Sequence, residues 1–136
     1  SIFEDALLFK LNADMGRATE TESNIYSSLL GNMMEELPEQ PHQKAPNLLI
    51  TIRVSFETML ERIKKRGRSF EQIANDPSLY SYYKNLNERY VQWYEDYNES
   101  PKMVIDGDKY DFVEDPAAAK KVLAMIDEKL IELNLK

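Results

Sequence analysis

The chain has 136 residues, of which 17 are lysine or arginine and 24 are aspartate or glutamate, so its formal net charge is −7. This length supports one domain, and the acidic balance argues against a nucleic-acid or anionic-membrane partner, because such binders need a broad positive surface. The absence of cysteine excludes a disulfide, a thiolate metal site and a cysteine nucleophile. No apolar run reaches membrane-spanning length and no signal peptide is visible, so we expect a soluble, cytoplasmic protein.

Two helices are predicted in the first forty residues. Apolar residues recur at helical spacing over residues 2–15, and Gly16 ends this pattern. A capping box, Thr19-Glu20-Thr21-Glu22, begins a second helix that Pro38 ends. The second helix has a wide apolar surface that includes Met33 and Met34, which is compatible with association between copies of the chain. The only histidine, His42, lies in the proline-rich connection that follows, and the pattern indicates no chemical role for it.

The remaining residues predict two strands separated by helices. Residues 48–54 form an apolar, β-branched run that is typical of a strand covered on both faces, and residues 103–105 form a second, shorter strand. Between them, Ser55 caps one helix, and Asp76-Pro77 starts an aromatic-rich helix over 77–98 that we expect Trp93 to anchor. Asp115-Pro116 starts the last helix. Strands joined through helices pair in parallel, so the pattern predicts an α/β fold that is mostly helical.

A basic run stands out in this acidic chain. Five cationic residues occupy seven positions: Arg62, Lys64, Lys65, Arg66 and Arg68. Arg62 and Arg66 share one helical face, and Gly67 marks the position where the helix ends. Guanidinium groups bind phosphate oxygens bidentately, so the run is a candidate phosphate clamp. The alternative is a solvated helix end whose cations offset the helix dipole, with Glu61 and Glu71 as partners. From the charge pattern alone this alternative is the more common case.

Three segments together resemble the deoxynucleoside kinase family. The pattern Leu60-x-Arg62-x-x-x-Arg66-Gly67-Arg68 is similar to the lid of these enzymes, and Ser1-Ile2-Phe3-Glu4-Asp5 to the end of their Asp/Glu-Arg-Ser motif. Val104-Ile105-Asp106, followed by Asp111-Phe112, is similar to their late strand and to the loop that senses the adenine of ATP. The resemblance is greatest to bacterial deoxyadenosine/deoxyguanosine kinases. It implies a P-loop NTPase-type nucleoside kinase fold, incomplete in this chain, with residues 1–136 forming a single domain that contains two parallel strands of the larger sheet.

The resemblance also implies a role for each site residue. Arg62, Arg66 and Arg68 would form the catalytic lid, in which Arg66 and Arg68 grip the ATP phosphates. Glu71 would accept a hydrogen bond from the 3′-hydroxyl of the substrate. The remaining assigned residues would contact the two bases, namely Asp5 and Phe9 at the substrate base and Asp111 and Phe112 at the adenine of ATP. Each residue also has a plain structural explanation: Phe9 and Phe112 in the core, Asp5 at a helix N-terminus, Glu71 as an exposed acid and Asp111 in a turn.

The family's phosphate loop is not found in this chain. The sequence contains no Gly-x-x-x-x-Gly-Lys-Ser/Thr, the motif that cradles ATP phosphates and helps to hold Mg²⁺. The chain starts at Ser1, without methionine and within a helical pattern, so we expect it to be the C-terminal portion of a longer protein. The Mg²⁺ ligands and the catalytic base would then lie upstream of Ser1. We therefore predict that the 136-residue chain alone is inactive.

The resemblance predicts the reaction and the partners of the intact enzyme. It would transfer the γ-phosphoryl group of ATP, with Mg²⁺, to the 5′-hydroxyl of deoxyguanosine or deoxyadenosine. It would form a homodimer through the first helices, and the missing N-terminal segment is a second candidate partner. Two alternatives stay open: a thymidylate or other nucleoside monophosphate kinase, which also has an arginine-bearing lid, and a non-catalytic helical interaction module, which would explain the missing phosphate loop.

Overall fold

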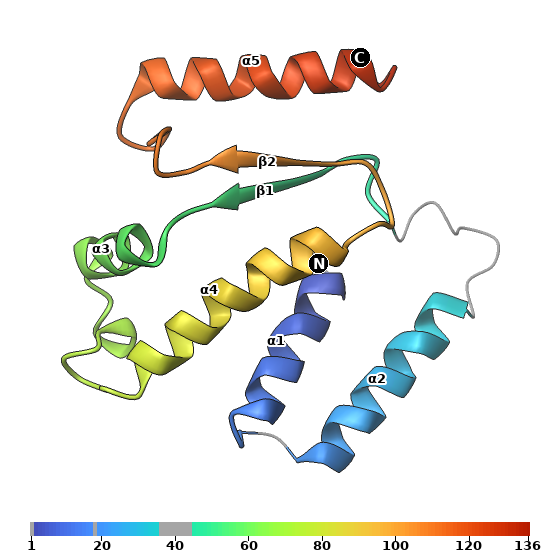
Figure 1. The fold of residues 1–136 in the computed structure, drawn as a ribbon, viewed down its shortest axis with the longest axis vertical. Helices are drawn as coiled ribbons and strands as arrows, with labels where there is room; N and C mark the ends of the chain where they lie inside the picture. The colour runs from blue at the N-terminus through green and yellow to red at the C-terminus, as the bar shows by residue number, and fades with distance from the viewer. Residues whose placement is uncertain (1, 18, 36–44) are drawn as a thin grey trace.

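The computed structural model describes residues 2–17, 19–35 and 45–136. Within the first two helices, some side chains lie outside the described set, among them those of Asp5, Met33 and Met34, and His42 also lies outside it. Figure 1 shows the arrangement of the elements. In chain order these are α1 (Ile2–Asp14), α2 (Glu20–Glu35), β1 (Leu49–Arg53), α3 (Phe56–Arg66), a 3₁₀ turn η2 (Ser69–Glu71), α4 (Leu79–Asp96), β2 (Lys102–Asp106) and α5 (Pro116–Glu132).

The two strands form a parallel sheet, as predicted. Leu49 pairs with Lys102 at one end and Arg53 with Asp106 at the other. Figure 1 shows the sheet between α5 on one side and α4, with α1 and α2 beyond it, on the other. Among the described residues, no helix is both long enough and apolar enough to cross a bilayer.

The prediction that the first strand is covered on both faces is wrong for the described part of the chain. The Ile50 and Ile52 side chains of β1 are 38% and 48% exposed, whereas Ile105 of β2 is 1% exposed. In the described residues β1 pairs with β2 along one edge only, and alternate β1 side chains are left uncovered. The apolar, β-branched run therefore identified the strand correctly, but it did not predict how far the two faces of the strand are buried.

Most of the predicted helix ends are confirmed. The Ser55 hydroxyl accepts a hydrogen bond from the Thr58 amide at 3.2 Å, and the Asp115 carboxylate accepts one from the Ala117 amide at 2.9 Å. The Thr19 hydroxyl accepts one from the Glu22 amide at 3.1 Å, which is one half of the predicted capping box. These contacts satisfy amides that have no partner within the first turn of a helix.

The start of α4 differs from the prediction. Asp76 was expected to cap a helix beginning at Pro77, but α4 begins at Leu79. The Asp76 carboxylate instead accepts hydrogen bonds from the amide and the hydroxyl of Ser78, at 3.1 and 2.6 Å. These bonds hold the pKa of Asp76 below its usual value. An aspartate in this position can form a local turn as readily as a cap, and here the turn forms.

The core is built largely from tyrosines of α4 and its C-terminal end. Tyr83, Tyr94 and Tyr97 are buried, together with Leu11 of α1 and Ile105 of β2. Trp93, expected to anchor this helix, is only half-buried, so that prediction is wrong. Its ring lies against those of its neighbours on the helix, 6.2 Å from Tyr90 and 5.5 Å from Tyr97. Which aromatic becomes the anchor depends on the face turned toward α1 and the sheet, and ring size alone does not determine it.

An ion pair joins α1 to α4. The Arg89 guanidinium lies 2.7 Å from the Asp14 carboxylate, and Lys10 lies 3.2 Å from the same group. The hydrogen bond from Arg89, followed by that from Lys10, lowers the pKa of Asp14 below its usual value. The pair is partly exposed, so its contribution to stability is small and is screened by salt.

We expect this pair to make stability depend on pH in the acidic range. Because the pKa of Asp14 is lower in the folded state, its contribution is present above about pH 4, the usual value for aspartate, and is lost as the pH falls through the folded pKa. Urea unfolding of Asp14→Asn and the parent protein at pH 7 and pH 3 measures this. The difference in unfolding free energy should shrink at pH 3, and an equal difference at both pH values would contradict the expectation.

Candidate functional site

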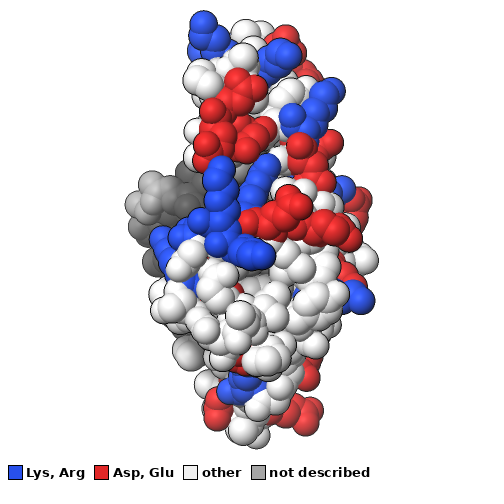
Figure 2. Space-filling view, turned by 90° about the vertical axis from the view of Figure 1, so that its left-hand side faces the viewer, with Lys and Arg blue, Asp and Glu red and all other residues white. Residues whose placement is uncertain are grey.

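A cavity of about 750 Å³ lies where α3, the segment after it, α4 and the loop after β2 meet. Five of the residues assigned to the site from sequence line it: Arg62, Arg66, Glu71, Asp111 and Phe112. They come from two segments about 45 residues apart in the chain. Figure 2 shows the side of the molecule that is on the left in Figure 1, where α3 lies, and on it basic side chains gather in one band beside acidic ones. The fold therefore brings together the predicted lid and the predicted adenine-sensing loop.

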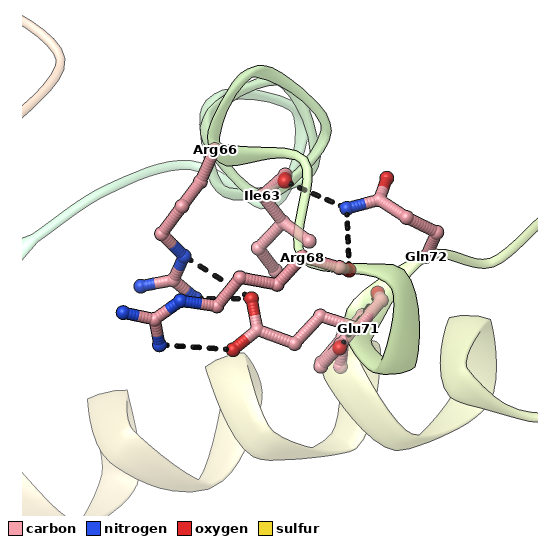
Figure 3. A network of polar contacts seen from close by, with 6 residues as sticks. Ile63, Arg66, Arg68, Glu71 and Gln72 are labelled. Atoms are coloured by element: carbon pink, nitrogen blue, oxygen red, sulfur yellow. Dashed lines mark hydrogen bonds and ion pairs between the residues drawn. The ribbon is translucent and has the colours of Figure 1, made fainter.

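Two of the lid arginines bind the lid carboxylate. Arg66 donates from Nε and Nη2 to Oε2 of Glu71, at 3.1 and 2.6 Å, while Arg68 approaches Oε1 at the limiting distance of 3.5 Å. Figure 3 shows both guanidinium groups pointing toward this carboxylate. The Glu71 side chain is 16% exposed, in contrast to 51% for Arg66 and 56% for Arg68. Glu71 is therefore an enclosed anion held by two exposed cations, which differs from a free exposed acid; the pairing itself is the one that the solvated-helix-end alternative also expects.

Helix α3 ends at the point where the chain must change direction to bring Glu71 to the arginines. Gly67 has φ +72°, in the left-handed region that glycine adopts without strain, and its amide donates to the Ile63 carbonyl at 3.2 Å. The chain then enters the short turn η2, which carries Glu71 back under Arg66. Gly67 thus ends the helix as predicted and permits the return of the chain.

Arg62 is held differently from the other two arginines. Its Nη2 donates to the backbone carbonyl of Gly107, just after β2, at 2.6 Å. Arg62 also lines the cavity, so it lies at the site while fixing α3 to the end of the second strand. A charged donor to a carbonyl gives a stronger hydrogen bond than a neutral one. This contact makes Arg62 a structural tie as well as a candidate phosphate ligand.

Two further contacts join α3 to the loop after β2. Lys65 lies 3.0 Å from the Glu114 carboxylate, and the Ser55 amide donates to the Asp108 carboxylate at 3.0 Å. The bonds from Ser55 hold the pKa of Asp108 below its usual value. Helix α3 and the loop after β2 are therefore joined to each other, and they line two sides of the cavity. Gly67 lies at the end of this joined part, directly after α3.

The predicted adenine-sensing residues, Asp111 and Phe112, lie in a turn of the loop after β2. The Asp111 carbonyl accepts from the Asp115 amide at 2.9 Å, and its carboxylate accepts from the Glu114 amide at 3.4 Å. Asp111 therefore forms the turn, and with Phe112 it also lines the cavity. The structural and functional explanations of these two residues are compatible with each other.

Phe9, one of the two predicted base-contacting residues of α1, does not line this cavity. Phe9 stacks on Tyr26 of α2, with ring centroids 4.4 Å apart and an interplanar angle of 5°, so one face of its ring is occupied. The side chain of Asp5 lies outside the described residues. Their roles at the substrate base stay predictions.

Sequence reasoning missed two residues at the site. Tyr83 was not singled out within the aromatic-rich helix, yet its hydroxyl donates to the Glu71 carbonyl at 2.9 Å and its side chain lines the cavity. Gly107 was not singled out, although it carries the carbonyl that Arg62 binds. For Gly107, its position directly after an apolar strand was an available signal. For Tyr83 there was none, because only the fold brings it to Glu71.

We expect removal of the Glu71 charge to strengthen phosphate binding at the lid. In Glu71→Gln the two arginines lose their carboxylate partner, so tripolyphosphate no longer has to displace it. Ion pairs with exposed partners are worth about 0.2–1 kcal/mol, which corresponds to a Kd that is lower by a factor of about 1.4 to 5. Isothermal titration with tripolyphosphate measures this. Glu95→Gln is the matched control, because Glu95 pairs with Arg53, 3.3 Å away and outside this cavity. Equal tightening in both variants would show a general charge effect instead.

Within residues 2–17, 19–35 and 45–136, no group of three or more histidine, cysteine, aspartate or glutamate side chains is placed to hold a metal ion. The guanidinium groups of Arg66 and Arg68 beside Glu71 suit an anion better than a divalent cation.

Comparison with known proteins finds related sequences along nearly the whole chain. Residues 1–132 match the family model for deoxynucleoside kinases. The chain is 60% identical over 133 residues to a deoxyadenosine kinase of Lactobacillus acidophilus, and the alignment covers 98% of this chain and 61% of that kinase. A deoxyguanosine kinase of the same species is 55% identical, with 98% and 58% covered. A deoxyadenosine/deoxycytidine kinase of Bacillus subtilis is 30% identical over 127 residues, with 93% and 55% covered.

The chain thus spans between 55% and 61% of the length of these curated relatives. No solved structure matches it significantly.

Proposed function

Because the chain belongs to the deoxynucleoside kinase family, we propose that it serves the transfer of the γ-phosphoryl group of ATP to the 5′-hydroxyl of a purine deoxynucleoside. The observation that carries the proposal is the shared cavity. It contains two of the three lid arginines, Arg62 and Arg66, together with an enclosed carboxylate and the loop of Asp111 and Phe112. We further propose that the 136 residues form a single domain and contribute part of a P-loop NTPase-type nucleoside kinase fold.

The chemistry of the cavity divides into a cationic part and an acceptor part. Phosphoryl transfer depends mainly on positioning and on stabilising negative charge. Arg66 and Arg68 supply two exposed guanidinium groups for this purpose. Glu71 supplies a carboxylate acceptor, which suits a sugar hydroxyl. In the proposal, phosphates bind Arg66 and Arg68 while Glu71 accepts a hydrogen bond from the 3′-hydroxyl of the deoxyribose. Arg62 holds α3 against the end of β2, which keeps the cationic part and the acceptor part of the cavity in fixed positions relative to each other.

The preference for a purine is proposed from the relatives. Both Lactobacillus acidophilus relatives share more than half of their aligned residues with this chain and are named for deoxyadenosine or deoxyguanosine, whereas the Bacillus subtilis relative is also named for deoxycytidine. In the proposal, Asp5 and Phe9 of α1 contact the substrate base. The adenine of ATP lies at Asp111 and Phe112.

For the Mg²⁺ that accompanies ATP, the described part of the chain offers no group of three or more histidine, cysteine, aspartate or glutamate side chains placed to hold it. We therefore assign no step to it through these residues. When bound with ATP, the ion would neutralise phosphate charge. The described residues bind and orient the anion and the sugar.

A substrate profile of the full-length gene product tests the proposal. With ATP and Mg²⁺, deoxyadenosine and deoxyguanosine should be phosphorylated with higher kcat/KM than deoxycytidine and thymidine. Nucleoside monophosphates should not be phosphorylated. Phosphorylation of thymidylate in place of nucleosides would establish the monophosphate kinase alternative, and no phosphorylation of any of these substrates would favour a non-catalytic module.

The isolated 136-residue chain is the companion sample. We propose that it has no measurable activity under the same conditions, because it contains no phosphate-loop motif. Turnover by the isolated chain at a rate near that of the full-length protein would contradict this part of the proposal.

A homodimer through the first helices is also proposed. Ile25 and Leu29 of α2 are each 57% exposed and lie four residues apart, so they form one apolar face of the helix. Burial of such a face against a second copy would be favourable. Light scattering of Leu29→Glu and of the parent protein tests it: the parent should have twice the mass of the variant, and two equal masses would contradict it.

A further inference from the structure

Tyr83 of α4 reaches the main chain of the lid. Its side chain is 8% exposed, and its hydroxyl donates to the carbonyl oxygen of Glu71 at 2.9 Å. That carbonyl belongs to the last residue of η2, where carbonyls no longer have partners inside the turn. Burial, followed by the negative charge of Glu71, raises the pKa of Tyr83 above its usual value, so the hydroxyl remains a donor at neutral pH.

A second side chain fixes the same short segment from the side of α3. The Gln72 amide donates to the carbonyls of Ile63 and Arg68, at 3.1 and 3.0 Å. Figure 3 shows both bonds, one to the end of α3 and one to the residue before η2. Gln72 therefore ties the lid segment to α3, and Tyr83 is the contact that ties it to α4.

These two contacts have different consequences for the Glu71 carboxylate. Gln72 holds the chain before and after Gly67, whereas Tyr83 holds the backbone of Glu71 itself. A side chain whose own main chain is fixed keeps its direction, which is a requirement for a group that must meet a substrate within a fraction of an ångström. Without the hydroxyl, the Glu71 carbonyl would lose its partner and η2 could shift away from α4.

We propose that Tyr83 is a positioning residue for Glu71: its hydroxyl fixes the Glu71 backbone so that the carboxylate is presented to the sugar 3′-hydroxyl. The inference rests on the proposed function, because it assigns the 3′-hydroxyl to Glu71. Tyr83 does not touch the substrate in this scheme. Its effect on the reaction passes through Glu71 alone.

The test compares Tyr83→Phe with the parent full-length protein on two substrates. Loss of one hydrogen bond should lower kcat/KM for deoxyadenosine about three- to tenfold, mainly through a higher KM. With 2′,3′-dideoxyadenosine, which has no 3′-hydroxyl, the variant and the parent should agree within about twofold. An equal loss on both substrates would show a merely structural role and would overturn the proposal, as would no loss on either.

Tyr82→Phe is the matched control. It removes a hydroxyl from the adjacent residue of α4, whose ring faces the Arg17 guanidinium 4.5 Å away, a contact that phenylalanine keeps. This variant should match the parent on both substrates. A deoxyadenosine-specific loss in Tyr82→Phe equal to that in Tyr83→Phe would overturn the specific assignment.

Two further measurements separate failure of this inference from failure of the proposed function. If Glu71→Ala lowers activity equally on both substrates, the assignment of Glu71 is wrong and the inference falls with it. If Glu71→Ala discriminates between the substrates and Tyr83→Phe does not, only the inference falls. If the parent protein phosphorylates no nucleoside, amide hydrogen exchange at residues 69–72 decides: faster exchange in Tyr83→Phe supports the positioning role, and unchanged exchange overturns it.

Discussion

Replacement of Arg66 by alanine in the full-length protein should lower kcat by about 10²- to 10³-fold, the range observed when a group that stabilises developing negative charge is removed from an active site. Arg66 is the residue best placed for this function. It ends α3 next to the Gly67 bend, its side chain is half-exposed at the cavity, and the Nε/Nη2 edge of its guanidinium already binds a carboxylate oxygen. A phosphate presents oxygen acceptors of the same kind.

Arg66→Lys distinguishes charge from geometry. Lysine keeps the charge but lacks the planar fork, so its kcat should fall between those of the parent and the alanine variant. Lys64→Ala is the control, because Lys64 is an exposed cation in the same turn of α3 and does not line the cavity. It should keep kcat within about twofold. If Arg66→Ala also kept kcat within that margin, the lid assignment would be wrong.

Replacement of Gly107 by alanine should destabilise the protein by about 1–3 kcal/mol, the usual cost of forcing extra volume into a packed site. A Cβ atom at this position would lie 2.6 Å from Cγ1 of Val54, 2.9 Å from Cγ2 of Ile52 and 3.1 Å from the Arg53 carbonyl. The two strand ends approach so closely because the Gly107 amide donates to the Arg53 carbonyl at 2.7 Å. The two nearest atoms belong to β-branched side chains, which are stiff, and the third is backbone, so the loop after β2 must move.

The expected consequence for the site is a displaced lid helix, because the Gly107 carbonyl is the acceptor for Arg62. Urea unfolding measures the loss of stability, and kinetic assays of the same variant should show a loss of kcat/KM. Gly31→Ala is the control, and it should change the free energy of unfolding in the opposite direction. Gly31 lies inside α2 with nothing within 4 Å of a built Cβ, so alanine should stabilise the helix by about 0.5–1 kcal/mol. Unchanged stability in Gly107→Ala would refute the packing argument.

Local features of the fold were predictable because their causes are local. Ser55 and Asp115 cap their helices, and Gly67 ends α3, for reasons that act within one turn of the chain. Parallel pairing also followed from chain order, because a helical connection between strands permits little else. The start of α4 was predicted two residues early, because Asp76 has two local options with similar energies and the sequence does not choose between them.

Burial was predicted less well. The apolar run of β1 indicated cover on both faces, and Trp93 indicated an anchor, yet Ile52 and Trp93 are at least partly exposed while Tyr94 and Tyr97 are buried. Whether a side chain is buried depends on which other elements pack against it, and not on the side chain alone. It depends on the crossing of α4 with α1 and the sheet, which is set by many weak contacts at once.

For the site, the sequence by itself determined the identity of the groups: three arginines around a glycine, a carboxylate three residues later, and an Asp-Phe pair in a distant loop. Their family resemblance was sufficient to identify deoxynucleoside kinases, since the family match and curated relatives bear this out. Only the tertiary structure decided which groups meet. It paired Arg66 with Glu71, fixed Arg62 to Gly107 and brought the Tyr83 hydroxyl to the Glu71 backbone. Side-chain chemistry is encoded residue by residue, but contacts between residues far apart in the chain exist only after packing has chosen one arrangement of the elements.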